Sequence, residues 1–268
     1  MQGSALLFAF GLTLLAGLAT GIGSLLAYFT GKTNTRFFSV ALGASGGVMV
    51  YISFLEILPE AQLKLTSALG RIPGSWTAVA AFFGGILLAA VIDRLVPETG
   101  NPHEVRKIES CAGCKPGGDR MLRVGLFTAT TIAVHNFPEG LAAFISALEN
   151  TSVGIAVTAA IAIHNIPEGI AVFVPVYLAT GNRRKAFLLS FLSGFSEPLG
   201  ALVGYFFLLP FYNDVLSGII FALVAGIMVF ISLDELLPAA REYGEAHLAI
   251  YGVAAGMLIM AVSLLLLA

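Results

Sequence analysis

Charged side chains are scarce in this sequence. Asp, Glu, Lys and Arg together make up 11% of the 268 residues, whereas hydrophobic residues make up 57%. Because a soluble domain carries about 25% charged residues, a chain this apolar is suited to a lipid bilayer and not to water. The formal net charge is only −2 and no basic patch is present, so we expect no nucleic acid partner.

Cysteine is almost absent. Only two residues separate Cys111 from Cys114, so a disulfide between them would link no distant segments, and the redox compartment stays open. With His103 they supply three possible zinc ligands, one fewer than a structural zinc site uses. A flexible solvated loop is therefore the favoured interpretation, and transient hand-off of a metal ion is the alternative.

Long apolar stretches recur along the chain. A membrane-spanning helix needs about 20 mostly apolar residues, and the first stretch is too long and too rich in glycine for a signal peptide. Eight stretches qualify, namely 4–29, 37–58, 74–96, 123–148, 152–178, 184–209, 215–237 and 247–267. We predict one transmembrane domain over residues 1–268, an all-α integral membrane protein built as an eight-helix bundle.

Lys and Arg are distributed unevenly among the predicted loops. If the N-terminus lies outside, the inner loops hold twelve of them and the outer loops hold only Lys64 and Arg71. Since Lys and Arg gather on the cytoplasmic side, this bias predicts that both termini lie outside and that the loop 97–120 is cytoplasmic. We expect a multi-pass protein of the cell membrane, in a bacterium the inner membrane.

Two pairs of segments repeat within the chain. Residues 47–61 match 226–240 at nine of fifteen positions, and residues 133–144 match 162–173 at eight of twelve. In the predicted topology, the two members of each pair cross the membrane in opposite directions. This predicts inverted repeats, with spans 1–3 and 6–8 arranged around spans 4–5, and a substrate site near the midplane.

The second pair carries the motif H-N-x-P-E-G. On a helix, its His and Glu are four residues apart and its Asn and Glu three apart, so all three side chains lie on one face. Proline deletes one backbone hydrogen bond in each motif, and the freed carbonyl needs a polar or protein-lined interior. The two faces consist of His135, Asn136 and Glu139, and of His164, Asn165 and Glu168.

Three carboxylates fall inside predicted spans, where no Lys or Arg accompanies them: Glu139, Glu168 and Glu197. A charge at the centre of a span costs about 2.5–3.5 kcal/mol, so these groups are either protonated or neutralised by a cation. Imidazole beside carboxylate favours Zn²⁺, with Fe²⁺, Mn²⁺, Co²⁺ and Cd²⁺ as further candidates, and disfavours Ca²⁺ and Mg²⁺. The alternative is that the histidines only form hydrogen bonds between neighbouring helices. Two matching His/Asn/Glu faces and a third carboxylate make this alternative the weaker one.

These motifs also carry a family resemblance. The paired HNFPEG and HNIPEG, the GFSEPLG around Glu197 and the M-V-x-I-S…E-x-L-P segments resemble the ZIP family of divalent metal transporters, most closely its bacterial ZupT subfamily. The resemblance implies a binuclear site in which Glu139 and Glu168 bridge two metal ions. It implies that His135 and His164 complete one site, that Asn136, Asn165 and Glu197 complete the other, and that Met49 is a further, weaker ligand. Some members carry H-E-x-P-H-E-G-D on the fifth span, and its absence here favours broader metal specificity.

Two further carboxylates, Glu56 and Glu235, occupy matching positions of the first repeat. They are either vestibule ligands at opposite mouths of the pathway or helix-end carboxylates among the lipid headgroups, and we keep both interpretations.

The sequence therefore predicts a transporter that imports zinc and related divalent ions into the cytoplasm, and not an enzyme. A metal-gated channel could use the same ligands. An intramembrane metalloenzyme would need H-E-x-x-H or a similar open site with its own base, and neither is present. Divalent ions and the bilayer are the expected partners, and a homodimer is compatible with this interpretation.

Overall fold

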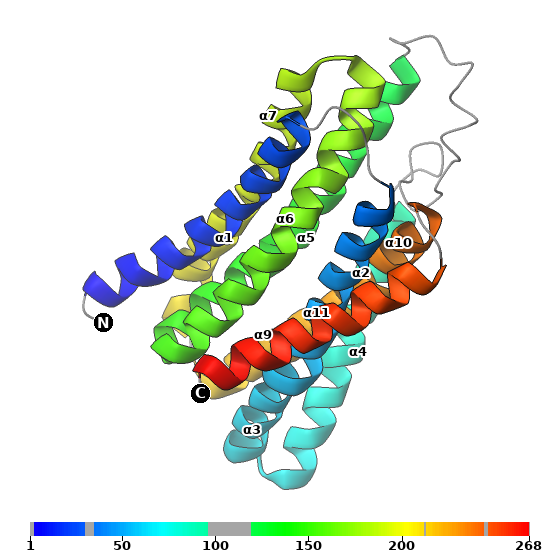
Figure 1. Ribbon diagram of the computed structural model, residues 1–268. Coiled ribbons are helices and arrows are strands. Elements are labelled where there is room, and N and C mark those ends of the chain that lie inside the picture. The colour runs from blue at the N-terminus through cyan, green and yellow to red at the C-terminus, as the bar shows by residue number, and fades with distance from the viewer. Residues whose placement is uncertain (1–2, 30–34, 96–118, 212, 244–245, 268) are drawn as a thin grey trace.

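The computed structural model describes residues 3–29, 35–95, 119–211, 213–243 and 246–267, and this part of the chain contains helices and no strand. The elements are α1 (Gly3–Phe29), α2 (Thr35–Ile52), η1 (Ser53–Ile57), α3 (Leu58–Leu69), α4 (Arg71–Leu95), α5 (Asp119–Glu149), α6 (Thr151–Thr180), α7 (Arg183–Gly194), α8 (Ser196–Val203), η4 (Gly204–Leu208), η5 (Leu209–Phe211), α9 (Asp214–Ile231), η6 (Ser232–Leu236), α10 (Leu237–Tyr243) and α11 (Ala246–Leu267). Several of these join end to end, so the fold is a bundle of long rods (Figure 1).

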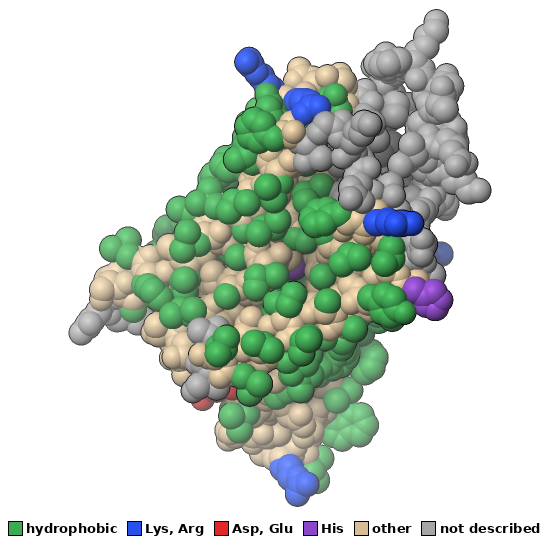
Figure 2. All heavy atoms as spheres, in the orientation of Figure 1, with side chains coloured by type: hydrophobic (Ala, Val, Ile, Leu, Met, Phe, Trp, Pro, Cys, Tyr) green, Lys and Arg blue, Asp and Glu red, His purple; other side chains and the backbone are tan. Residues whose placement is uncertain are grey.

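Seven of the described helical stretches are long and apolar enough to cross a membrane. The remaining long helix, α5, is more polar because its first turns carry Asp119 and two arginines and its middle carries the H-N-x-P-E-G motif. Large apolar side chains such as Leu7, Trp76 and Leu266 point outward and are more than 70% exposed. In Figure 2 the middle of the visible face is hydrophobic or uncharged, and Lys and Arg lie toward its rim. The prediction of an all-α membrane bundle is confirmed.

The rods pack as two groups. The α5–α6 group comprises α1, α5, α6, α7 and α8, and the α2–α9 group comprises α2, α3, α4, α9, α10 and α11. In the first group α1 lies along α6, and α7 with α8 lies along α5; in the second, α11 lies along α2, and α4 lies along α9. Each pairing has a counterpart under one exchange of helices, as the inverted repeats require. The exchange swaps α1 with α7–α8, α2–α3 with α9–α10, α4 with α11, and α5 with α6.

The first sequence repeat forms the same irregular helix twice. A π-helical turn over Ser53–Ile57 separates α2 from α3, and another over Ser232–Leu236 separates α9 from α10. In each, the residue after the turn donates its N–H to the serine that begins it, Leu58 to Ser53 and Leu237 to Ser232. Pro59 and Pro238 follow directly. Because proline has no N–H, the α-helical bond is lost there and the wider turn closes the gap.

Glycine permits the closest helix contacts. A Cβ added at Gly140 would lie 2.1 Å from the carbonyl oxygen of Glu197, and one at Gly226 would lie 2.0 Å from that of Phe82. The first contact joins α5 to α8 and the second joins α9 to α4. Every other close approach at a described glycine also joins helices of the same group. Backbone-to-backbone packing, which small residues allow between membrane helices, therefore holds each group together internally.

Candidate metal site

The predicted ligands lie where α5 and α6 run side by side and meet α8. The spacing within each motif places its polar side chains on one helical face, and the structure turns both faces inward. The side chains of Asn136, Glu139, His164, Asn165, Glu168 and Glu197 are all at most 1% exposed. His135 lies in α5, but its side chain falls outside the described residues. Polar groups buried this deeply are costly unless they form hydrogen bonds or ion pairs with other polar groups.

The two motifs are joined to one another. His164 Nε2 on α6 lies 3.1 Å from Glu139 Oε2 on α5. With its amide nitrogen turned toward the surrounding acceptors, Asn136 on α5 donates to Glu168 Oε2 on α6 at 3.3 Å and to the carbonyl of Ile132 at 3.0 Å. Each motif thus contacts the glutamate of the other, and the pseudo-symmetry of the repeat extends to its side chains.

Asn165 links the α6 motif to two other helices. Its Nδ2 donates to the carbonyl oxygen of Ala16 on α1 at 2.9 Å, and also donates to Glu197 Oε1 on α8. Glu197 Oε2 and Asn165 Oδ1 are buried and have no hydrogen-bond partner among the described residues. A carboxylate oxygen and an amide oxygen, two kinds of group that can bind a metal ion, are therefore held in the interior beside the paired motifs.

A break in the helix between α7 and α8 positions Glu197. The helix is interrupted at Phe195, whose N–H reaches the carbonyl of Leu192, and α8 restarts at Ser196. Glu197 therefore lies in the first turn of α8, where the helix dipole favours a negative group. Pro198 fits the start of a helix because its missing N–H would have no partner there.

The described side chains do not by themselves form a closed metal site. No group of three His, Cys, Asp or Glu residues among them is placed to hold one ion. Two of the six described polar side chains at the junction are the amides of Asn136 and Asn165, and the imidazole of His135 is not described. What the structure shows is a buried junction of carboxylate, imidazole and amide groups.

The weaker predicted ligands lie on the other helix group. Met49 on α2 is fully buried, one turn from Ser45, whose hydroxyl lies 3.4 Å from the carbonyl oxygen of His164. Glu56 and Glu235 sit inside the two π-helical turns and are half-buried. Cys111, Cys114 and most of the loop 97–120 lie outside the described residues.

Sequence reasoning missed the part played by α1. Ala16 contributes its carbonyl oxygen to Asn165, and a main-chain group leaves no motif in the sequence. The available signal was the adjacent Gly17, where an added Cβ would lie 2.4 Å from the carbonyl oxygen of Gly194. Glycine at such a place indicates that α1 lies against the backbone of its neighbours.

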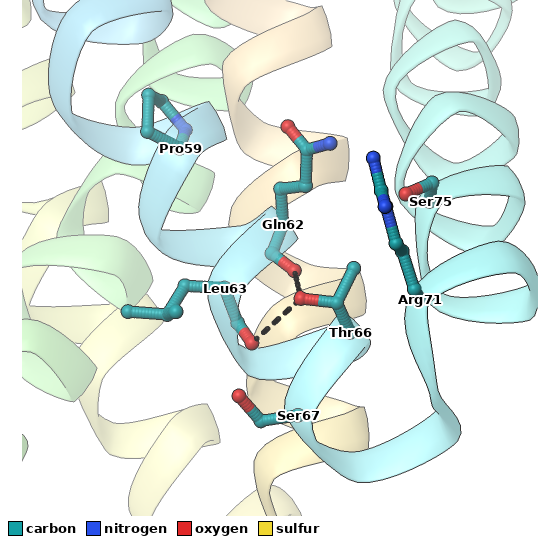
Figure 3. A pocket seen from close by; sticks show the side chains of 7 residues that line it. All are labelled: Pro59, Gln62, Leu63, Thr66, Ser67, Arg71 and Ser75. Carbon is teal, nitrogen blue, oxygen red and sulfur yellow. Dashed lines mark hydrogen bonds between the residues drawn. The ribbon is translucent and has the colours of Figure 1, made fainter.

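The surface cleft between α3 and α4 lies away from the predicted ligands. A cleft of about 560 Å³ between α3 and α4 is lined by Pro59, Gln62, Leu63, Thr66, Arg71 and other residues. In it the Thr66 hydroxyl donates to the carbonyls of Gln62 and Leu63 (Figure 3). No predicted ligand lines this cleft. The buried junction, and not the surface cleft, is therefore the candidate metal site.

Comparison with known proteins shows which family the chain is similar to. The family model described as ZIP Zinc transporter matches residues 97–264. A zinc transporter ZupT of Lysinibacillus sphaericus is 60% identical over 269 residues, covering 100% of both chains. That of Streptococcus mutans is 62% identical over 258 residues, covering 96% of this chain and 97% of its own. That of Clostridium perfringens is 56% identical over 273 residues, covering 97% and 96%.

Proposed function

The chain belongs to the ZIP zinc transporter family, and on this premise we propose that it carries zinc ions across a cell membrane. Membership confirms the resemblance found in the sequence. Because the family and the relatives are transporters, the prediction that the chain is not an enzyme is confirmed as well, and the metalloenzyme alternative falls away. The substrate, the site and the direction of transport are proposals for this chain.

The observation that carries the proposal is the cross-linking of the two buried motifs. Glu139 is contacted by His164, and Glu168 is contacted by Asn136. Each glutamate has two oxygens, so one oxygen can serve an ion on the histidine side while the other serves an ion on the asparagine side. We assign His135 and His164 to the first ion, and Asn136, Asn165 and Glu197 to the second, with both glutamates bridging.

Ligand chemistry sets the range of ions. Imidazole nitrogen and carboxylate oxygen together suit Zn²⁺ and also Fe²⁺, Mn²⁺, Co²⁺ and Cd²⁺, which we include as substrates. An asparagine-containing site offers fewer charged ligands than one of histidine and carboxylate alone, and therefore discriminates less sharply among divalent ions. Calcium and magnesium prefer all-oxygen sites and are excluded.

The division into two helix groups supports a carrier mechanism. The strongest candidate ligands belong to the α5–α6 group, whereas Met49, Glu56 and Glu235 belong to the α2–α9 group. Glycine contacts hold each group together and none of the described ones crosses between them. We infer that the α5–α6 group moves as a unit with the metal and that the three weaker ligands meet the ion along its way.

The proposed orientation of the chain rests on the Lys and Arg distribution, which assigns both chain ends to the outside. Figure 1 shows the two marked ends at the same side of the bundle. A small cleft of about 180 Å³ between α5 and α7, lined by Ala129, Ala133 and Ser193 among others, lies just before the α5 motif on the side assigned to the cytoplasm. A cysteine placed at Asn101 should react with a membrane-impermeant thiol reagent only from the cytoplasmic side. Labelling from outside would reverse the proposed orientation.

Zinc uptake into proteoliposomes tests the proposal directly. Purified protein is reconstituted into liposomes that enclose a zinc-sensitive dye. Uptake is then compared between the wild type, Glu139→Ala and Glu168→Ala. Glu60→Ala removes a half-exposed carboxylate on α3 and serves as the matched control. We expect saturable uptake that both site variants lose and the control retains. Absence of uptake by the wild type would refute zinc transport, and unsaturable uptake would favour the channel alternative.

A further inference from the structure

An ion pair joins the end of α5 to α3. Lys64 Nζ on α3 lies 2.9 Å from Glu149 Oε2, and the two side chains are only 14% and 18% exposed. The other carboxylate oxygen of Glu149 accepts a hydrogen bond of 2.7 Å from Ser217 on α9, a fully buried residue. The lysine ammonium also lies 6.0 Å from the ring centre of Phe221 on α9. Glu149 is thus held from two helices at once.

This cluster crosses the boundary between the two helix groups. Lys64 and Ser217 belong to the α2–α9 group, and Glu149 belongs to the α5–α6 group. The second carboxylate beside the lysine, Glu60 at 3.6 Å, stays within α3. At the candidate site the same boundary is bridged by a weaker contact, Ser45 Oγ to the His164 carbonyl at 3.4 Å.

Glu149 is also the last residue of α5, next to the turn that joins α5 to α6. A single residue, Asn150, separates the two helices. Its side chain accepts from the N–H groups of Ser152 and Val153 at 2.9 and 3.3 Å, which caps α6 and stiffens the turn. A force on Glu149 therefore acts on the hairpin that carries both H-N-x-P-E-G motifs.

We propose that Lys64, Glu149 and Ser217 form a latch that holds this hairpin against α3 and α9 and keeps the metal site closed toward the outside. The inference rests on the proposed movement of the α5–α6 group and on the proposed orientation, in which this end of the bundle is external. Charge-assisted hydrogen bonds that are largely shielded from water are stronger than exposed ion pairs. They must break before α5 can separate from α9, so the latch sets how often the site opens outward.

A cysteine reporter tests the latch without measuring transport. Ser146 lies one turn before Glu149 on the same face of α5 and is only 4% exposed. In a Cys111→Ser/Cys114→Ser background, Ser146→Cys is exposed to an external, membrane-impermeant thiol reagent with no metal added. We expect labelling to become several-fold faster in Glu149→Gln and in Lys64→Met. The matched control Glu60→Gln removes a carboxylate from the same lysine within α3 and should leave the rate unchanged.

Two further variants make the result decisive. The exchange Lys64→Glu/Glu149→Lys should restore slow labelling, which loss of folding would not do. A disulfide in Lys64→Cys/Glu149→Cys should stop zinc uptake until a reductant is added. Unchanged labelling in both single variants, equal acceleration by Glu60→Gln, or full uptake by the cross-linked protein would overturn the latch. Because labelling needs no zinc, these outcomes are separable from a failure of the transport proposal.

Discussion

His164 Nε2 lies 3.1 Å from Glu139 Oε2, across 25 residues of sequence and between two different helices. Both side chains are at most 1% exposed. The pair joins the second copy of the H-N-x-P-E-G motif to the first, so a change in one copy alters the surroundings of the other. The candidate site therefore behaves as one unit in which single substitutions do not act independently.

His164→Ala should abolish most zinc uptake. It removes a proposed ligand and also the contact that His164 makes with the buried Glu139. Breaking a buried pair of this kind costs about 3–5 kcal/mol. The double variant His164→Ala/Glu139→Ala should be little worse than the single one, because the pair acts as a unit. Initial uptake rates at matched protein amounts measure both. Additive losses would show that the two residues serve separate sites.

Glu197→Ala and Asn136→Ala should change the rate or the metal selectivity more than they reduce zinc uptake to nothing. Both residues belong to the side of the junction that we assign to the second ion, and the histidine side stays intact. Competition of zinc uptake by Cd²⁺, Mn²⁺ and Co²⁺ measures the effect. Complete loss of zinc uptake in both variants, with normal folding, would mean that the first metal site cannot work when the second is disrupted.

Pro138→Ala and Pro167→Ala should slow transport. Alanine restores the backbone hydrogen bond that proline removes, which straightens the helix at the motif and shifts the glutamate that follows. Both prolines directly precede a candidate ligand, Glu139 or Glu168. Zinc uptake at matched expression tests this, with Pro210→Ala, a proline in η5 away from the motifs, as the control. Wild-type rates in both motif variants would remove the prolines from the mechanism.

Apparent zinc affinity should weaken as the pH falls. Zinc binds neutral imidazole and ionised carboxylate, so protons compete with the metal for every ligand. The loss should be marked on approach to the pKa of an ordinary histidine, about 6.5. Uptake measured as a function of zinc concentration from pH 5.5 to 7.5 gives the affinity at each pH. An affinity that is constant over this range would contradict ligation by histidine and carboxylate.

Replacing Cys111 and Cys114 together by serine should leave most transport intact. Their spacing supplies too few ligands for a stable site, and a solvated loop needs no cysteine. Zinc uptake and maximal rate of the double variant measure this. A near-complete loss would instead make the cysteines a hand-off site.

Helices and candidate ligands could be predicted because their signals are local. Apolar stretches long enough to cross a bilayer predict spanning helices, and the spacing within H-N-x-P-E-G predicts which side chains share a face. Partners between helices could not be predicted in this way. That Glu139 contacts His164, that Asn165 binds the Ala16 carbonyl, and that Lys64 reaches Glu149 all depend on how the rods are placed.

The irregular turns also escaped prediction. The predicted second span ends at residue 58, yet the helical path continues through η1 and α3 to Leu69. The π-helical turn supplies the one extra residue that lets the chain pass the proline. Both the turn and α3 pack on α9, a contact between distant segments that the local sequence does not record.

That extra residue in η1 fixes the rotational register of α3 against α2. Each residue of an α-helix turns the chain by about 100°, so winding all five residues of Ser53–Ile57 as regular α-helix would rotate everything beyond them by roughly that angle. Lys64 would then point away from Glu149, while Met49, which precedes the turn, would keep its place. The π-helical turn thus aims one end of the rod independently of the other, so a carrier built this way can orient its site and its outer closure separately.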